Sequence, residues 1–453
     1  MNLTKNSIST PGRREPQQTL DDYPMSAVQI GAVVICVLLN ALDGFDILSI
    51  SFASPGIAEE WGIDRASLGV VLSMELIGMA IGSLLIGRAA DKIGRRPTIL
   101  GCLVIMAVGM LAAALAQSIV DLSIYRVATG IGIGGMLAST NAMVAEYANA
   151  KSRNMAVILM VGGYPLGIVL GGSVSAELLE YYDWRAVFYF GALVTALFVV
   201  LAWRFLPESV HFLIGRGSER DLKKANVILA KMGRMPVVRS PYRQGNIGQE
   251  VESILSPGLR RTTILLTLAY FAHIMTHYYF LKWIPKIVVD MGYIASTAGT
   301  ILVWANVGAI TSSVIMGALS HRFAMRPLTM LVLVACGVAI TMFGMEAGSL
   351  TSLAILAVVA GFFAQASVVG LYALFVQYFP TSIRATGTGF AIGIGRGGAA
   401  VGPIAAGLLF SAGYGLQSVS VIMAFGSLLA CLALFLISPP RRADAVPVSE
   451  QSG

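Results

Sequence analysis

The stretch that decides the fold is residues 87–97, GRAADKIGRRP, together with a second copy, GALSHRFAMRP, at residues 317–327. Both copies begin with glycine, end with arginine and proline, and follow an apolar run long enough to cross a bilayer. The copies are 230 residues apart, and Arg153 and Arg384, which follow two later apolar runs, are 231 apart. Two markers with nearly the same offset predict that the chain consists of two copies of one unit.

The composition around these loops is that of a membrane protein. Of the 453 residues, 56% are hydrophobic and 12% are charged, whereas about 25% are charged in soluble proteins. Such a chain cannot cover a water-soluble fold with charge, which excludes soluble enzymes, disordered proteins and secreted disulfide scaffolds. The four cysteines each stand alone in an apolar run and are interpreted as packing residues: Cys36, Cys102, Cys336 and Cys431.

Apolar runs of about 20 residues predict transmembrane helices. Twelve such runs occur, at residues 27–53, 66–88, 97–117, 119–145, 154–178, 186–206, 261–286, 296–320, 327–346, 350–378, 386–411 and 415–437. The predicted fold class is an all-α polytopic membrane protein with twelve transmembrane helices in two pseudo-symmetric six-helix bundles. The expected divisions are a cytoplasmic N-terminal tail (1–26), an N-terminal bundle (27–206), a cytoplasmic central loop (207–260), a C-terminal bundle (261–438) and a cytoplasmic C-terminal tail (439–453).

Positive charge predicts how these helices are oriented. With the N-terminus in the cytoplasm, 25 of the 31 Lys and Arg residues fall in cytoplasmic segments, as expected when positive loops stay inside. We therefore expect a multi-pass protein of the plasma (inner) membrane with both termini in the cytoplasm. The net charge of +7 is then a topology signal and not a nucleic-acid site. The other six basic residues are Arg65, Arg126, Arg185, Lys282, Lys286 and Arg396, of which Arg126 and Arg396 stand out because they lie within apolar spans.

Several short motifs resemble those of a known family. The loop 87–97 has a glycine, an acid four residues later and then Gly-Arg-Arg, which resembles the hallmark loop of the major facilitator superfamily. RVATGIGIGG at 126–135, PES at 207–209 and FPTSIRATGTG at 379–389 are similar to further motifs of that superfamily, and GGYPLGIVLGG at 162–172 is similar to one in its proton-linked members. The resemblance implies transport by alternating access, with gating residues at Gly87, Asp91, Gly94, Arg95, Arg96, Glu146, Arg153 and Arg384.

Two acidic residues lie inside the first apolar span. Asp43 and Asp46 are three residues apart and so project from nearly the same face of a helix. Two carboxylates this close do not both stay ionised in a dry site, which makes at least one a candidate proton carrier. Both are also candidates for substrate binding, because Gly44 between them is expected to leave room for a ligand. The element resembles that of the aromatic acid:proton symporter family, the 4-hydroxybenzoate and benzoate type of transporter, where its aspartates are required for transport. In the alternative, both aspartates only pair with Arg126 and lock helices together.

The two arginines inside spans are candidates for binding an anion. Arg126 lies in the first half and Arg396 in the second, so a substrate carboxylate could sit between them. Its apolar ring would then contact aromatic residues, for which the candidates are Tyr164, Trp304 and Tyr372. In the alternative, Arg396 pairs with an internal acid.

Four further polar residues inside spans have no assigned role. His273 and His277 are four apart on one helix, but no other metal ligand lies near them in the sequence, so no metal site is predicted. Substrate hydrogen bonding and a titrating role both remain possible for the pair. Glu75 and Gln365 can each be a relay, a gate or a packing residue.

These observations favour a carrier over the other membrane functions. No catalytic constellation or nucleotide loop is present, and a pore would more naturally show rings of like charge than a duplicated half with buried acids and bases. The expected function is proton-coupled uptake of an aromatic carboxylate such as benzoate or hydroxybenzoate, by a monomer in the lipid bilayer that needs no cofactor besides the proton gradient. The alternative is a carrier of a non-aromatic organic acid or a sugar. The sequence does not select one acid or a number of protons.

Overall fold

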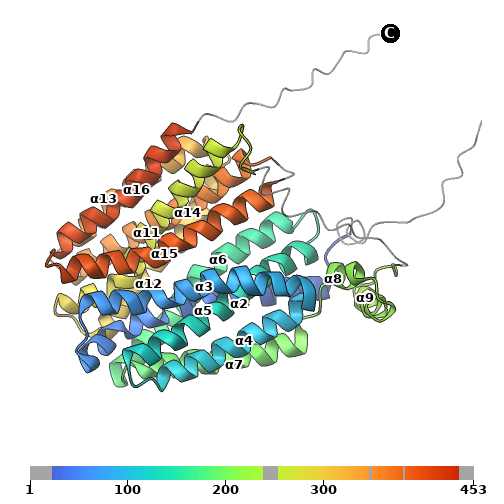
Figure 1. The fold of residues 1–453 in the computed structure, drawn as a ribbon, viewed down its shortest axis with the longest axis horizontal. Helices are drawn as coiled ribbons and strands as arrows, with labels where there is room; N and C mark the ends of the chain where they lie inside the picture. The colour runs from blue at the N-terminus through green and yellow to red at the C-terminus, as the bar shows by residue number, and fades with distance from the viewer. Residues whose placement is uncertain (1–22, 238–253, 346–348, 381–382, 438–453) are drawn as a thin grey trace, which may run out of the picture.

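The computed structural model describes residues 23–237, 254–345, 349–380 and 383–437, and all regular structure within these ranges is helical. Twelve helices have 20 residues or more and run in two groups of six (Figure 1). The first group is α2 (Ala27–Trp61), α3 (Arg65–Ile93), α4 (Arg95–Ala114), α5 (Ile119–Tyr147), α6 (Arg153–Tyr181) and α7 (Arg185–Phe205). The second is α11 (Arg260–Asp290), α12 (Ala295–Leu319), α13 (Met325–Met345), α14 (Leu350–Tyr378), α15 (Arg384–Ser411) and α16 (Leu416–Leu436).

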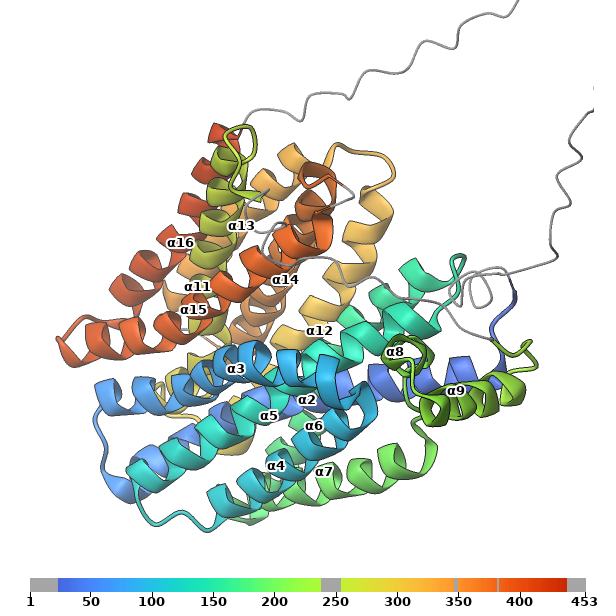
Figure 2. The same ribbon diagram turned by 45° about the vertical axis from the view of Figure 1, so that its right-hand side comes forward.

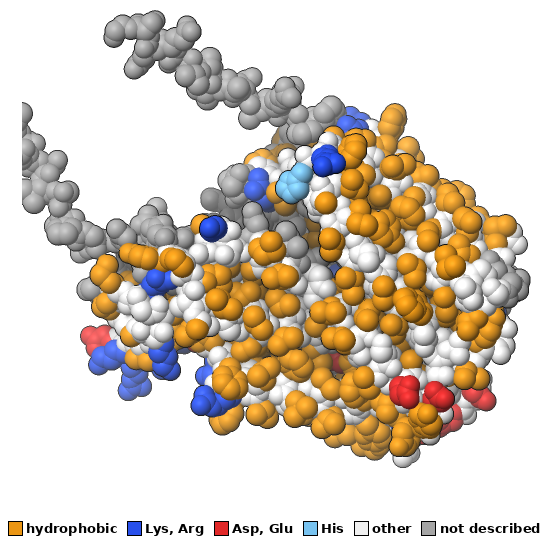
Figure 3. Space-filling view, turned by 180° about the vertical axis from the view of Figure 1, so that it is seen from behind, with side chains coloured by type: hydrophobic (Ala, Val, Ile, Leu, Met, Phe, Trp, Pro, Cys, Tyr) orange, Lys and Arg blue, Asp and Glu red, His pale blue; other side chains and the backbone are white. Residues whose placement is uncertain are grey.

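Eleven of these helices are long and apolar enough to cross a membrane by length and composition. The twelfth long helix, α6, has 29 residues and packs against α2 and α12, in the chain position where the fifth span was predicted. Large apolar side chains cover the outside of the bundles, as expected for a surface in contact with lipid. Figure 3 shows this apolar surface between basic side chains on the left and a group of acidic side chains at the lower right.

The helix pairing repeats between the two groups. In the first group α2 packs on α6, α3 on α5, and α4 on α7. In the second group the same pairs recur as α11 on α15, α12 on α14, and α13 on α16. The contacts between groups obey the same symmetry, because α3 packs on α15 and α6 packs on α12, with α2 against α11 near the axis. The predicted fold class of two pseudo-symmetric six-helix bundles is confirmed.

The two bundles touch most closely at the end where α2 joins α3. A Cβ on Gly69 of α3 would lie 2.6 Å from the carbonyl oxygen of Pro403 on α15, and one on Gly407 would lie 2.5 Å from that of Arg65. Only glycine allows this backbone contact. Figure 2 shows the ribbons of α3 and α15 side by side at the left and the two groups diverging toward the right.

The described part of the segment between the bundles contains two short helices, α8 (Val210–Arg216) and α9 (Glu219–Lys231). Helix α9 packs on α8 and is amphipathic: Ala225 and Leu229 are buried, and Lys223 and Lys224 are exposed. The predicted central loop, 207–260, is therefore partly helical. Its residues 238–253, and most of the two predicted tails, lie outside the described residues.

Candidate functional site

Among the described residues, five charged side chains within the long helices are fully buried. They are Asp43 and Asp46 on α2, Glu75 on α3, Arg126 on α5 and Lys282 on α11, each with 0% exposed surface. The first four belong to one bundle and Lys282 to the other. Buried charges in a membrane protein are costly and are retained where they have a function or a partner. This cluster is therefore the candidate site.

The partner of Arg126 is Glu75. Arg126 Nη2 forms an ion pair with Glu75 Oε2 and donates a hydrogen bond of 2.8 Å to the backbone carbonyl of Asp46. The guanidinium also lies 5.5 Å from the ring centroid of Phe188, a cation–π contact. Glu75, whose role the sequence left open, thus neutralises the cation that was predicted to bind substrate.

Lys282 is a second cation at the same carboxylate, and the sequence analysis missed it. Its Nζ atom lies 3.7 Å from Glu75 Oε2 and donates to the backbone carbonyl of Ile47. The seventh span was expected to end at residue 286, which put Lys282 near the membrane surface, but α11 continues to Asp290. The apolar residues that follow Lys282 at 283–285 and 287–289 were the available signal that the span extends further.

Asp43 and Asp46 lie in the same region without a partner. In the described part of the chain, no oxygen of either carboxylate has a hydrogen-bond partner, so the predicted alternative of two Asp–Arg126 pairs is not seen. Asp43 lies within electrostatic range of Asp46, Glu75 and Arg396.

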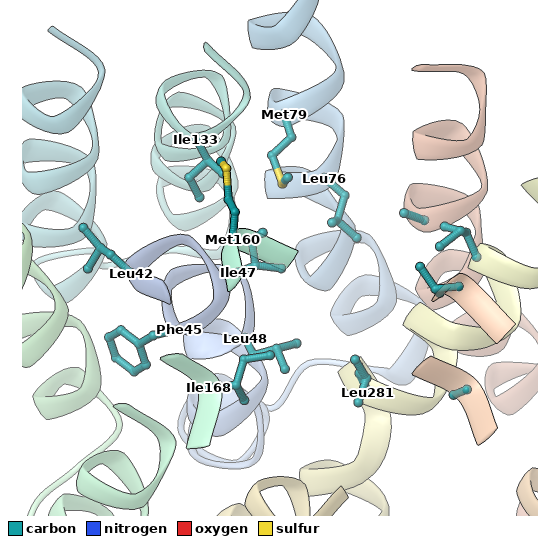
Figure 4. Close-up of a cluster of buried hydrophobic side chains, with 14 of the residues drawn as sticks. Leu42, Phe45, Ile47, Leu48, Leu76, Met79, Ile133, Met160, Ile168 and Leu281 are labelled. Carbon is teal, nitrogen blue, oxygen red and sulfur yellow. The ribbon is translucent and has the colours of Figure 1, made fainter. Parts of the chain in front are cut away.

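Large apolar side chains pack beside the charged ones in this region. Figure 4 shows the large side chains of the same stretch of α2, among them Leu42, Phe45 and Leu48, with Leu76 from α3 and Leu281 from α11. Because the two aspartate carboxylates are buried without hydrogen-bond partners among the described residues, they are the candidates for taking up and releasing a proton.

Gly44 does not leave room for a ligand as expected. A Cβ on Gly44 would lie 2.1 Å from the backbone carbonyl oxygen of Tyr164 on α6. The glycine instead lets α6 pack directly on α2, since any side chain at this position would overlap the neighbouring backbone. This prediction was wrong, and the same contact holds the aromatic ring of Tyr164 next to the aspartates.

Two pairs of tyrosines lie in the region of Arg396. The hydroxyl groups of Tyr164 and Tyr278 are 3.3 Å apart across the two bundles, and those of Tyr270 and Tyr372 are 3.2 Å apart. Arg396 donates from Nη1 to the carbonyl of Met79 at 3.4 Å, one turn along α3 from Glu75. The predicted residues Tyr164, Tyr372 and Arg396 thus each contact the groups named here, and their role toward a substrate stays a prediction.

Trp304 is not brought to this region. It lies on α12 with 47% of its surface exposed and lines a surface cavity of about 410 Å³ together with Leu350 and Ile355. Its ring therefore faces away from Arg126, and the prediction that it contacts the substrate has no support from this position.

The histidine pair is buried and only one member is fully hydrogen-bonded. His273 uses Nδ1 toward Ser427 Oγ at 3.0 Å and Nε2 toward the carbonyl of Ala364 at 2.9 Å. A histidine with both nitrogens occupied in this way fits a packing role. His277 contacts Tyr278 edge to face, with ring centroids 5.5 Å apart, and its Nδ1 has no hydrogen-bond partner among the described residues.

Three of the predicted gating residues, Asp91, Arg95 and Glu146, are linked by ion pairs at the end opposite Gly69. Asp91 and Arg95 are 3.0 Å apart, and Arg95 also lies 3.5 Å from Glu146. Arg96 donates to the carbonyl of Trp203 at 2.6 Å. Gly94 has φ 113°, a conformation that favours glycine and that turns the chain from α3 into α4.

Glu208 completes this network, although the sequence analysis did not select it as a site residue. Its Oε1 atom accepts hydrogen bonds from the backbone N–H groups of Arg95 at 3.0 Å, Arg96 at 3.2 Å and Ser209 at 2.8 Å. It therefore caps the N-terminus of α4, whose first residues have no partners within the helix. Burial raises the pKa of Glu208 above its usual value, against the opposing effect of these backbone donors.

Arg153 and Arg384 make equivalent contacts in the two bundles. Arg153 Nη2 donates to the carbonyl of Ala148 at 3.2 Å, and Arg384 Nε donates to that of Phe379 at 3.4 Å. Each arginine thus reaches the residue five positions back, just after the end of α5 or α14. The repeat that the sequence indicated is visible in these contacts.

The chain is similar to known transporters along its whole length. The family model for the Major Facilitator Superfamily matches residues 36–294 and 266–452. The 4-hydroxybenzoate transporter PcaK of Pseudomonas aeruginosa is 31% identical over 97% of this chain and 100% of its own length. The 3-(3-hydroxy-phenyl)propionate transporter of Escherichia coli is 30% identical over 90% of this chain and 93% of its own length. Among solved structures, the partially occluded inward open xylose transporter XylE of E. coli has a TM-score of 0.73 at 17% identity, over 93% of this chain and 100% of that one.

Proposed function

Because the chain belongs to the major facilitator superfamily, we propose that it carries an aromatic carboxylate across the membrane together with protons. The observation that carries the proposal is the buried cluster of three acids and two bases between two bundles, since such a cluster suits an anion and a proton. The names of the relatives support the substrate class, because they describe transporters of 4-hydroxybenzoate and of 3-(3-hydroxy-phenyl)propionate.

The proposed chemistry assigns separate tasks to separate side chains. Arg126 binds the substrate carboxylate, because a planar guanidinium can replace the water around an anion through paired hydrogen bonds. Tyr164 and Tyr372 contact the aromatic ring, and Arg396 stands beside them. Asp43 and Asp46 carry the coupled proton, since both are buried without partners.

Transport then proceeds by rocking of the two bundles about this cluster. The moving bodies are the N-terminal bundle 27–206 and the C-terminal bundle 261–438, joined by the segment 207–260. The ion pairs of Asp91, Arg95 and Glu146 would brace α3, α4 and α5 where the N-terminal bundle forms its side of the cytoplasmic gate. In this proposal the protein is a monomer of the inner membrane with both termini in the cytoplasm, and it uses the proton gradient without a bound cofactor.

The second candidate function is transport of a non-aromatic organic acid or a sugar. The xylose transporter shares the fold of this chain, but at 17% identity the likeness extends to the fold alone. A neutral sugar would leave Arg126 and Arg396 without an anionic ligand. The aromatic carboxylate is therefore the favoured substrate.

Uptake by the purified protein in proteoliposomes tests the proposal. We expect labelled benzoate, 4-hydroxybenzoate, gallate or 3-(3-hydroxyphenyl)propionate to accumulate when the outside is more acidic, and a protonophore to abolish the accumulation. Counterflow, in which unlabelled acid inside accelerates entry of labelled acid, separates a carrier from a pore. Accumulation that follows sodium with the proton gradient collapsed would overturn proton coupling, and xylose uptake without uptake of any acid would favour the second candidate.

A further inference from the structure

The buried ion pairs define a carboxylate site that has two cations and joins the two bundles. Arg126 Nη2 from α5 and Lys282 Nζ from α11 both approach one atom, Oε2 of Glu75, with Lys282 at 3.7 Å. All three side chains have 0% exposed surface. The position between the two cations is therefore already filled by a carboxylate, which is the same chemical group that an aromatic acid would bring.

We propose that Arg126 and Lys282 together bind the substrate carboxylate, and that Glu75 occupies their site until it takes up a proton. This inference rests on the proposed function, because it names the atoms that recognise the acid. It replaces Arg396 by Lys282 as the second cation of the site. Arg396 donates a hydrogen bond to the Met79 carbonyl at 3.4 Å, and within the described residues the ion pairs of Glu75 are with Arg126 and Lys282.

The exchange balances in charge and in protons. Ionised Glu75 gains one proton from the outer solution and becomes a neutral carboxylic acid, and the substrate carboxylate takes its place beside Arg126 and Lys282. The net charge of the site is the same before and after, so each anion enters with one proton at this site. On the inner side Glu75 releases its proton to water. The ionised carboxylate then pairs again with Arg126 and Lys282 and displaces the substrate.

The same geometry suppresses a leak of protons without substrate. If Glu75 were protonated and no acid were bound, Arg126 and Lys282 would remain buried with no anion between them. Two uncompensated buried cations are strongly unfavourable. The protonated empty form is thus rarely populated, and proton entry depends on the arrival of the anion.

Other charged and titratable groups face Glu75 and share in the pH dependence. The exchange at Glu75 is additional to the protons on the two aspartates, which the proposed function uses. Glu75 lies within electrostatic range of both aspartates and of two tyrosines. Arg396 contacts α3, the helix that carries Glu75. The full set is Asp43 and Asp46 on α2, Arg126 on α5, Tyr164 on α6, Lys282 and Tyr278 on α11, and Arg396 on α15.

Binding measurements on the purified protein in nanodiscs test the exchange. The probe is the acid that raises the melting temperature of the wild type most, chosen from benzoate, 4-hydroxybenzoate, gallate and 3-(3-hydroxyphenyl)propionate. We expect Glu75→Gln to bind it with a flatter dependence on pH and more tightly than the wild type at high pH. In a weakly buffered solution with a pH indicator, the variant should take up about one proton fewer per acid bound. An unchanged proton count would overturn the proposal.

Lys282→Met tests the second cation independently. Loss of one charge-assisted contact should weaken binding by about tenfold or more. The pH above which affinity falls should also move upward, because a cation that favours ionised Glu75 is removed. Unchanged affinity and an unchanged pH profile would exclude Lys282 from the site. If Glu75→Gln does not yield folded protein, Lys282→Met and the double variant E75Q/K282M carry the test.

Two exposed residues supply matched controls, and one outcome separates the two proposals. Glu177→Gln on α6 and Lys223→Met on α9 make the same chemical changes at the surface and should bind like the wild type. If no acid of the panel binds the wild type, the proposed function fails. If an acid binds and drives uptake but Glu75→Gln retains the wild-type proton count, only the exchange at Glu75 fails.

Discussion

Arg65 on α3 and Asp290 on α11 join the two bundles through an ion pair of 3.0 Å between Nη2 and Oδ2. The backbone N–H of Ala66 also donates to Ser411 Oγ of the other bundle at 2.9 Å. These contacts lie at the end where Gly69 meets Pro403, opposite the Asp91 network. They hold together the end of the molecule that must open for substrate to enter from that side.

Removing this ion pair should loosen that end of the molecule. The pair is partly exposed, so it contributes up to about 1 kcal/mol, or about fivefold in the equilibrium between closed and open. We expect Arg65→Gln to raise the labelling rate of a cysteine at Ser73 by a membrane-impermeant thiol reagent. Ser73 is buried on α3 one turn from Gly69 and on the same face.

The control for this experiment is an ion pair within one bundle. Arg185 on α7 contacts Glu60 on α2 at 2.7 Å, at the same end of the molecule. Arg185→Gln should leave the labelling rate of Ser73→Cys unchanged. The native cysteines are replaced in all three proteins. Equal acceleration by both variants would mean that general loosening, and not the link between bundles, controls access.

Replacing either buried aspartate should separate transport from proton coupling. In Asp43→Asn and Asp46→Asn the side chain keeps its size but can no longer carry a proton, so we expect gradient-driven accumulation to be lost. Counterflow should persist because it needs no net proton movement. Asp183→Asn, at an exposed position, serves as the control. Normal accumulation by Asp46→Asn would remove the aspartates from the coupling mechanism.

Arg126→Ala should abolish substrate binding and also destabilise the protein. The substitution leaves Glu75 with only Lys282 near it, and breaking a buried ion pair from one side costs about 3–5 kcal/mol. Arg126→Lys should rescue binding poorly because an ammonium group lacks the planar fork of donors. Thermal melting and binding of the chosen acid measure the two effects.

A double variant separates stability from binding at this position. In Arg126→Ala with Glu75→Gln the unpaired carboxylate is gone, so the melting temperature should recover toward that of the wild type. Binding should stay lost. Recovery of both would show that Arg126 only supports folding.

Gly44→Ala should disrupt the packing of α6 on α2. The new Cβ would lie 2.1 Å from the Tyr164 carbonyl oxygen, so one helix must shift, at a cost of about 1–3 kcal/mol. We expect a lower melting temperature and weaker binding, since Tyr164 moves with α6. Gly31→Ala on the same helix has no atom within 4 Å of its Cβ and should not lower the melting temperature.

Glu208 should stabilise the protein mainly as a hydrogen-bond acceptor. Its raised pKa means that burial disfavours the charged form, so loss of charge alone should cost little. Glu208→Gln keeps a carbonyl oxygen for the amides of Arg95 and Ser209 and should melt near the wild-type temperature. Glu208→Ala removes the cap of α4 and should cost about 0.5–2 kcal/mol. Equal losses in both variants would show that the negative charge is what matters.

The sequence alone determined the fold and the location of the acidic pair. Helices that cross a membrane need long apolar runs, so hydropathy along the chain marks them directly. The offset of 230 residues between two loops indicated the duplication that the helix pairing then showed. Charges inside apolar spans are rare, and this rarity drew attention to Asp43, Asp46 and Arg126.

Only the tertiary structure decided which charges meet. Glu75, Arg126 and Lys282 lie on three helices and are far apart in the sequence, and no periodicity along the chain specifies which faces of different helices turn toward each other. The burial of Lys282 could not be predicted because hydropathy locates the end of a span only to within a few residues. The prediction for Gly44 was wrong for a different reason. A missing side chain can admit either a ligand or a neighbouring helix, and only packing in three dimensions distinguishes them.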